Sequence, residues 1–275
     1  MTQTIPYWHV DAFASRPFGG NQAAVMVLDE WLPDDVLVAI GAENLFAETA
    51  FVVRDATGEA DWELRWCTPT YEIALCGHAT LASGHVLLTR DAEGQARDRV
   101  TFRTRQSGVL EVVRAAGGYE LALPAIATTP DTASHQADAI RLLGAEPRDI
   151  ARSDLGYNIY LYENEAAVRA LAPDIRGLER LGTDQFIATA PGIATDIVSR
   201  VFVPGGGVDE DSVTGSAHAA LTPYWAKRLG RDSFTAHQAS TRGGNLALRL
   251  AKDDAGDRAW LGGPCVTVVE GRFYL

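Results

Sequence analysis

Glu48 is the first residue of this 275-residue chain whose surroundings suggest acid/base chemistry. It lies in the stretch Asn44–Phe51 with apolar neighbours on both sides. Removing a carboxylate from water raises its pKa above the usual value of about 4.3, toward the range useful for taking up and returning a proton. The same position also suits an ion-paired or capping glutamate at a strand edge. Glu48 is therefore a candidate acid/base with a structural role as its alternative.

A second stretch whose residues could take part in chemistry is Leu75–Thr80, which reads Leu-Cys-Gly-His-Ala-Thr. Gly77 permits a tight turn, and the helix expected after it presents free backbone N–H groups to an anion. His78 would be a hydrogen-bond donor or proton carrier there, or a histidine satisfied within the core. Cys76 could be a thiolate activated by the helix N-terminus, although a free cysteine is more often a small buried apolar residue.

A third stretch is the acidic loop that leads into a second small-residue helix. It contains Asp211, Gly215 and Ser216 and ends at His218. Consecutive carboxylates usually form a solvated face or a helix cap. The spacing is neither that of an EF-hand loop nor that of a zinc helix with two histidines four residues apart. We therefore predict no metal here.

Two glycine-rich turns complete the candidate residues. Phe18–Asn21 precedes a strand, and Gln238–Gly244 connects two strands. Glycines in such places allow either a tight turn or close approach of the backbone to a ligand. Asn21 and Arg242 are the polar side chains that these turns would present, and a guanidinium is a good partner for a ligand carboxylate.

Short strands and a few helices must position these residues. The pattern of aromatic, β-branched and turn residues predicts strands in the first half at 7–13, 23–28, 49–54, 62–66, 100–105, 109–114 and 119–123. In the second half it predicts strands at 157–162, 185–190, 197–203, 234–239, 246–251 and 266–269. Helices are expected at 34–42, 78–88, 139–143 and 216–229, and the second of these is apolar enough to be a buried central helix.

The length and a Pro/Ser/Thr-containing stretch at 124–137 predict two domains, 1–123 and 124–275. The last strand of the chain is a candidate for completing the first domain. Cys76-Gly77-His78-Ala79 recurs 138 residues later as Thr214-Gly215-Ser216-Ala217. Because each copy is a small turn that opens an apolar helix, the two halves are expected to share one plan.

Composition limits the class of protein. A net charge of −12 and a pI near 4.9 disfavour nucleic acid and anionic membrane surfaces as partners. Three cysteines without paired spacing indicate neither disulfides nor a zinc knuckle. No apolar run approaches the roughly 18 residues of a membrane span, and the start lacks the features of a signal peptide. We expect a cytoplasmic protein.

Taken together, the motifs resemble the PhzF-like family of phenazine-biosynthesis isomerases, along nearly the whole chain and in the same order. This resemblance implies an α+β fold of two similar domains, each a mostly antiparallel sheet curled around a central helix, as in diaminopimelate epimerase, with the active site in the cleft between the domains. The motifs are Val10–Phe13 with Phe18–Asn21, Glu48–Phe51, Arg65–Trp66 with Thr68–Thr70, Leu75–Thr80, Asp209–His218, and Gln238 with Arg242–Gly244.

The resemblance also implies an activity, which is cofactor-independent isomerisation of a small carboxylate by a homodimeric enzyme. Glu48 would move the proton between two carbons. The residues that would bind substrate are Asn21, Gly77, His78, Asp211, Gly215 and Ser216, with Cys76 and Arg242 as further candidates.

Several positions depart from the family pattern and leave the substrate open. Ala47, Cys67, Ser212 and Gln22 stand where the family often has other residues. The related epimerases use two cysteines, and Thr214 occupies the place of the second, which disfavours a two-thiol racemase because a hydroxyl is too weak an acid. An epimerase that uses Cys76 with another base, and a non-catalytic small-molecule binding protein, remain alternatives.

Overall fold

A computed structural model describes residues 3–134, 136–253 and 256–275 of the chain. The chain forms two compact units. The first comprises the residues up to Leu123 together with Gly262–Leu275, and the second is Pro124–Leu261. The second unit thus ends at 261 rather than at 275, because the C-terminal strand pairs with the first strand of the chain and so completes the first unit.

The first unit is a mostly antiparallel sheet. By pairing, its strands follow the order β18, β1, β2, β3, β4, β6, β7, β8, and only the β2–β3 and β4–β6 pairs are parallel. Its elements are β1 (Thr4–Ala12), β2 (Asn21–Val27), α1 (Asp34–Asn44), β3 (Glu48–Arg54), β4 (Trp62–Cys67), β5 (Glu72–Ile73), α2 (Gly77–Arg90), β6 (Arg99–Thr104), β7 (Val109–Ala115), β8 (Gly118–Pro124) and β18 (Cys265–Tyr274), with a 3₁₀ turn at Gly94–Ala96.

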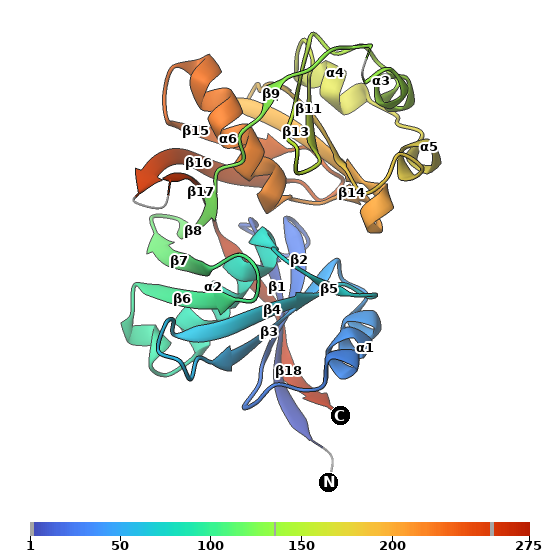
Figure 1. Ribbon diagram of the computed structural model, residues 1–275. Helices are drawn as coiled ribbons and strands as arrows, with labels where there is room; N and C mark the ends of the chain where they lie inside the picture. The colour runs from blue at the N-terminus through green and yellow to red at the C-terminus, as the bar shows by residue number, and fades with distance from the viewer. Residues whose placement is uncertain (1–2, 135, 254–255) are drawn as a thin grey trace. The chain divides into compact units, whose positions relative to one another are not determined.

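Helix α2 is the centre of the first unit. It contacts β1, β2, β3, β6, β7 and β18, so the sheet curls around it (Figure 1). Nearly all of its residues from Gly77 to Leu88 are buried, which explains why the sequence has Ala, Gly and Leu there instead of one polar face. The predicted buried helix is confirmed, and its N-terminus carries Gly77 and His78.

The second unit repeats this plan. Its elements are β9 (Thr129–Pro130), α3 (Ala137–Leu143), β10 (Asp149–Arg152), β11 (Tyr157–Leu161), α4 (Glu165–Ala170), α5 (Ile175–Glu179), β12 (Gln185–Pro191), β13 (Ile197–Val203), a 3₁₀ turn at Pro204–Gly206, β14 (Val208–Asp211), α6 (Gly215–Leu229), β15 (Ser233–Gln238), β16 (Gly244–Asp253) and β17 (Gly256–Gly263). The pairs β11–β12 and β13–β15 are parallel, and the other described pairs of this unit are antiparallel.

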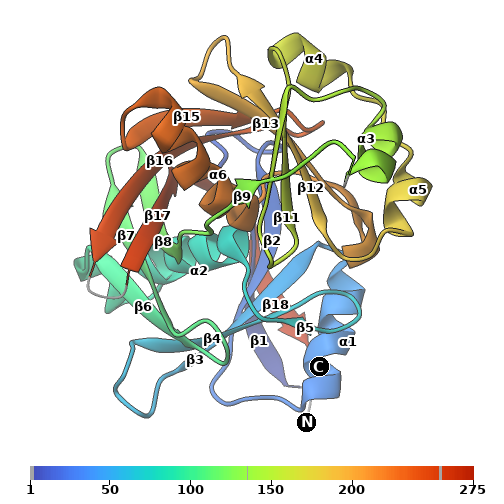
Figure 2. The same ribbon diagram turned by 45° about the horizontal axis from the view of Figure 1, so that its top comes forward.

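The two units correspond element by element around their helices. In the first, β4 pairs antiparallel with the short β5, α2 follows, and β6 returns parallel to β4. In the second, β13, β14, α6 and β15 do the same. Figure 2 shows α6 against the strands of its unit, and α6 contacts β16 and β11. The fold predicted by the resemblance is confirmed in both units.

The acidic run differs from the loop that its composition predicts. Val208–Asp211 forms β14 and pairs with β13. The reason is a cross-strand ion pair: the Arg200 guanidinium donates to both carboxylate oxygens of Glu210 at 2.8 and 2.9 Å. This pairing offsets the poor strand propensity of consecutive carboxylates. In the described part of the chain no helix is long and apolar enough to cross a membrane.

Candidate active site

Glu48 begins β3 directly after the turn that ends α1. Leu45 has φ = 55°, and its N–H donates to the Gly41 carbonyl oxygen, which closes the helix in a left-handed cap. The chain then enters β3, which pairs parallel with β2 so that Glu48 lies opposite Ala23. The Glu48 side chain is 15% exposed, so most of the carboxylate is withdrawn from solvent while some access for a ligand remains.

Asn21 begins β2 and is held by the turn that precedes it. The buried Asp11 carboxylate accepts a hydrogen bond from the Phe18 N–H at 2.8 Å. Gly20 has φ = 61°, and a Cβ there would collide with the Ala12 carbonyl oxygen. Glycine is therefore required, because it alone combines this left-handed conformation with so close an approach of two backbone segments.

His78 contacts both residues, one with each ring nitrogen. The Asn21 side-chain amide donates to Nδ1 across 3.1 Å, and Nε2 lies 3.2 Å from the Glu48 Oε2. Because an amide N–H occupies the Nδ1 lone pair, the proton of the neutral imidazole belongs on Nε2, where it faces the carboxylate. Asn21 thus sets the imidazole tautomer, and the His78 Nε2 lies within ion-pair distance of the Glu48 Oε2 but makes no hydrogen bond with it.

The start of α2 adds a fixed positive field to this group. Cys76 is the N-cap residue, and its side chain makes no capping hydrogen bond, so the cap itself leaves the first N–H groups of the helix available. Such a terminus favours negative charge, including a ligand carboxylate. Gly77 is the first residue of this helix.

Backbone strain is concentrated next to the site. Among the described residues, the non-glycine residues with positive φ are Phe13, Phe18 and Leu45. The first two lie in the turn that leads to Asn21, and the third lies three residues before Glu48. Left-handed backbone at a bulky residue costs about 1–3 kcal/mol and persists only where surrounding contacts enforce it. Its location indicates that placing Asn21 and Glu48 has been favoured over relaxed turns.

Cys76 also lies within this group. Its Sγ is 3.5 Å from the His78 Nδ1, and the residue is only 5% exposed. Donor atoms of Glu48, Cys76 and His78 lie within 4.8 Å of one another, so these three residues could hold a metal ion that accepts sulfur, nitrogen and oxygen ligands. The structure therefore adds the Cys76 thiol to the group formed by Glu48 and His78.

Sequence reasoning missed two residues beside the site, His9 and Asp11. The His9 Nε2 lies 3.7 Å from the Asp11 Oδ1 and 3.2 Å from the Gln22 Nε2, and its ring packs on Phe46 at 4.4 Å between centroids. His9 and Asp11 are two residues apart in β1, and this spacing puts two polar side chains on one face of a strand. That spacing was the available signal.

In the second unit the corresponding helix start is organised by Gln238. This fully buried amide accepts from the Thr214 N–H at 2.8 Å and donates to the Asp211 carbonyl oxygen at 2.7 Å. The Thr214 hydroxyl in turn donates to the Asp211 carboxylate at 2.6 Å. The structure therefore brings Asp211 to the start of α6.

The remaining candidates of the second unit lie on α6 and on the turn after β15. Gly215 is the first residue of α6, and the Ser216 hydroxyl accepts from the Gln185 side chain at 3.1 Å. Arg242 is half-buried on the turn between β15 and β16. His218 is a core histidine: its Nδ1 donates to the Thr214 carbonyl oxygen at 2.7 Å, and Ser199 lies 3.3 Å from Nε2.

The buried His218 should make the stability of the protein depend on pH. Burial lowers its pKa to about 4, against about 6.5 for an exposed histidine. The unfolded chain therefore binds this proton more readily, and stability present above pH 6.5 is lost as the pH falls toward 4. Between pH 7 and pH 5 we expect His218 alone to lower the free energy of unfolding by about 2 kcal/mol. His85, whose pKa burial also lowers to about 4, acts in the same pH window.

Urea unfolding at the two pH values checks this. Between pH 7 and pH 5, the free energy of unfolding of His218→Gln should fall clearly less than that of the wild type. Thr222→Ala is the matched control, because it removes a buried hydroxyl of the same helix that donates to the His218 carbonyl oxygen but does not titrate. A wild-type stability that does not fall over this range would contradict the assignment.

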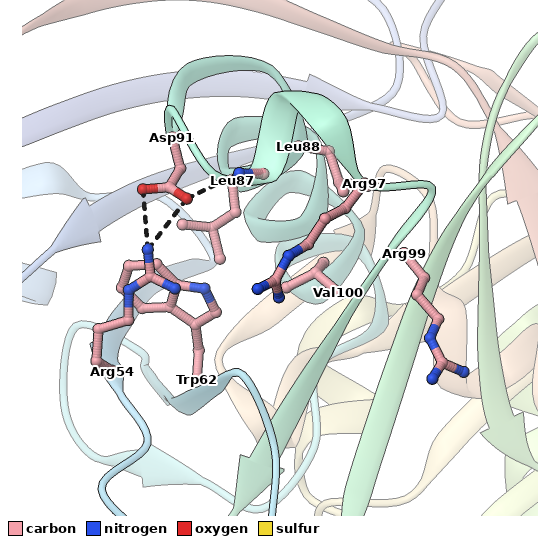
Figure 3. Close-up of a pocket in the computed structure, with 9 residues that line it drawn as sticks. Arg54, Trp62, Leu87, Leu88, Asp91, Arg97, Arg99 and Val100 are labelled. Carbon is pink, nitrogen blue, oxygen red and sulfur yellow. Dashed lines mark hydrogen bonds and ion pairs between the residues drawn. The ribbon is translucent and has the colours of Figure 1, made fainter. Parts of the chain in front are cut away.

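A small hollow at the other end of α2 is structural. Its volume of about 10 Å³ holds at most one water molecule. Figure 3 shows the Arg54 guanidinium donating to both Asp91 carboxylate oxygens, at 3.1 and 3.2 Å, while it lies over the Trp62 ring. Leu88 in its wall is ten residues beyond His78, or roughly 15 Å along the helix. This hollow is separate from the group around Glu48.

Comparison with known proteins shows the family of this chain. A family model described as "Phenazine biosynthesis-like protein" (PhzC-PhzF) matches residues 10–271. An uncharacterised isomerase of Pseudomonas aeruginosa is 45% identical over 271 residues, which cover 98% of this chain and 99% of that protein.

Solved structures agree. A crystal structure of a PhzF-family protein from Enterococcus faecalis superposes with a TM-score of 0.87 at 37% identity, covering 99% of this chain and 100% of that one. A predicted epimerase of P. aeruginosa shares the fold, with a TM-score of 0.71 at 18% identity over 98% and 99% of the two chains. The chain therefore belongs to the phenazine biosynthesis-like (PhzC-PhzF) family.

Proposed function

We propose that this protein is an isomerase that moves a proton between two carbons of a small carboxylate, with Glu48 as the acid/base. The observation that carries the proposal is the position of Glu48, a largely buried carboxylate 3.2 Å from the His78 Nε2 and close to the start of α2. Relatives named isomerases, such as the one from P. aeruginosa, support the same reaction class.

The steps follow from the charges. The ligand carboxylate binds at the N-terminus of α2, where the Gly77 and His78 backbone N–H groups stabilise negative charge. Glu48 takes the proton from one carbon and becomes a neutral acid. The electron pair left behind shifts along the ligand, and Glu48 returns the proton to another carbon, so the enzyme ends as it began. No oxidant, reductant or water is consumed, and the mechanism uses no cofactor.

His78 and Asn21 have supporting roles in this scheme. The His78 Nε2 lies 3.2 Å from the Glu48 Oε2 and stands beside the carboxylate, while Asn21 fixes the imidazole tautomer. Asn21 would then act as a positioning residue beside the ligand. Asp211, Gly215 and Ser216 of the second unit, with Arg242, remain predicted ligand-binding residues.

Proton NMR in deuterated water tests the reaction class. The wild-type protein is incubated with a panel of small unsaturated and amino carboxylates, including dihydro-hydroxyanthranilate, and deuterium entry at carbon is followed. EDTA is present in one series and absent in another, because Glu48, Cys76 and His78 could bind a metal. We expect deuterium entry or a shifted double bond in at least one ligand, with and without EDTA. Ligands that bind, seen as line broadening, but never exchange would support the binding-protein alternative instead.

A further inference from the structure

The side chains of Glu48, Cys76 and His78 converge on one point in the first unit. One ligand atom from each residue lies within 4.8 Å of the ligand atoms of the other two. The Cys76 Sγ is 3.5 Å from the His78 Nδ1, and the Glu48 Oε2 is 3.2 Å from the His78 Nε2. Ligand atoms on a tetrahedral zinc ion are about 3.3–3.6 Å apart, because the bonds to zinc are about 2.0–2.3 Å long. The group therefore has to contract by no more than roughly 1–1.5 Å to close around such an ion.

The His78 Nε2 is the ring nitrogen that can bind the ion. His78 is 4% exposed, and within the described part of the chain its Nε2 has no hydrogen-bond partner. The Nδ1 contacts the Asn21 amide at 3.1 Å, and the direction of that bond depends on the tautomer. With the proton on Nδ1 and the Asn21 amide turned over, the amide oxygen accepts the proton, and Nε2 keeps a lone pair for the metal. Metal-bound histidines are usually held by a second group in this way.

The charges of the group favour a divalent ion. A thiolate and a carboxylate bring two negative charges, and a neutral imidazole brings none, so an ion with two positive charges gives a neutral complex in this largely buried place. The Cys76 thiol releases its proton to solvent as the bond from sulfur to metal forms. Sulfur and nitrogen ligands disfavour magnesium and calcium, which bind oxygen, and suit zinc.

We propose that Glu48, Cys76 and His78 form a binding site for zinc, and that the bound ion inhibits the protein. Zinc on the Glu48 carboxylate occupies the lone pairs that would take the proton from carbon. The Cys76 side chain makes no capping hydrogen bond at the start of α2, so its Sγ can turn toward the ion. The inhibition rests on the function proposed above, whereas the binding of zinc does not.

Cobalt(II) reports on the site directly, because it binds where tetrahedral zinc binds and absorbs light. Wild-type protein titrated with Co²⁺ without oxygen should show the near-ultraviolet band of a cobalt–thiolate bond. Added zinc should remove this band, and magnesium should not. Cys76→Ser should lose the band and bind zinc at least about 100-fold more weakly. Cys265→Ser is the matched control, because it removes another free thiol of the first unit, and it should behave like the wild type.

Two further measurements use the wild-type protein alone. Calorimetry with zinc at pH 7, in two buffers that differ in ionisation enthalpy, should show the release of about one proton per ion bound. In the deuterium-exchange assay, zinc should slow exchange at least about tenfold, and EDTA should restore the original rate. Circular dichroism of all variants checks that they fold like the wild type.

The outcomes separate the zinc site from the proposed reaction. A thiolate band in the wild type without deuterium exchange in any ligand would support the zinc site and count against the isomerase. A wild type without the band, or a band that survives in Cys76→Ser, would overturn the site. Exchange that continues at full rate in the zinc-loaded protein would overturn the inhibition.

Discussion

Glu48→Gln is expected to lower the rate of deuterium exchange into the ligand by about 10²–10⁴-fold, the usual contribution of a positioned acid/base. The amide has nearly the shape of the carboxylate but cannot accept the proton from carbon. Because the Glu48 side chain is 15% exposed and lies 3.2 Å from the His78 Nε2, the amide of a glutamine fits the same space. Ligand binding and circular dichroism should therefore change little, and the loss should appear in the exchange rate.

The control for this variant is Glu59→Gln, an exposed glutamate on the loop between β3 and β4, which should exchange like the wild type. Cys76 provides the competing outcome, because its Sγ lies 3.5 Å from the His78 Nδ1. If Glu48→Gln keeps full exchange while alkylation of Cys76 abolishes it, the base is the thiolate and our assignment of Glu48 is wrong.

Gly20→Ala should be strongly damaging to the first unit. We expect a loss of about 3 kcal/mol or more in the free energy of unfolding, together with at least tenfold slower exchange. The alanine would be strained at φ = 61°, and its Cβ would strike the Ala12 carbonyl oxygen and the Ala14 Cβ. The backbone must shift to relieve this collision, and Asn21, the next residue, shifts with it.

A substitution at Gly58 separates the effect of left-handed backbone strain from that of the steric collision. It has φ = 79°, but nothing lies within 4 Å of the position that an alanine methyl group would take, so Gly58→Ala carries the conformational strain alone. We expect it to cost only about 1 kcal/mol and to leave exchange unchanged. Urea unfolding and deuterium exchange on both variants give the comparison. Equal effects of the two substitutions would show that the close approach at Gly20 is not what holds the turn.

Local sequence signals predicted the elements well where one pattern dominates. The apolar run at 78–88 became α2 at Gly77–Arg90, and Pro33 with two following aspartates marked the start of α1. β14 was missed because its pairing depends on Arg200 reaching Glu210 from another strand. Helix α4 was missed because it is only six residues long, with Val168 its buried residue. Such elements exist through tertiary contacts, which a local window does not contain.

The candidate site also combines residues that a local pattern indicates with contacts that only the folded chain forms. The sequence singled out Glu48 and His78 separately, but their contact joins residues 30 positions apart and depends on how β3 pairs with β2 beside α2. The hydrogen bond from Asn21 to His78 spans 57 positions and required the turn around Gly20. Residue types thus indicated the chemistry, while the geometry became visible only in the folded chain.

The place of β18 in the first unit has a consequence during synthesis. The ribosome finishes residue 123 and must then add all of Pro124–Leu261 before it makes the strand that pairs with β1. At about 5–20 residues per second, these 138 residues (124 to 261) take roughly 7–28 s. Throughout that interval the nascent β1 lacks one neighbour, whereas the second unit is already complete at its end. The second unit is therefore free to fold before the first. A chain truncated before Gly262 would lose the strand that completes the first unit, although the residues removed are at the C-terminus.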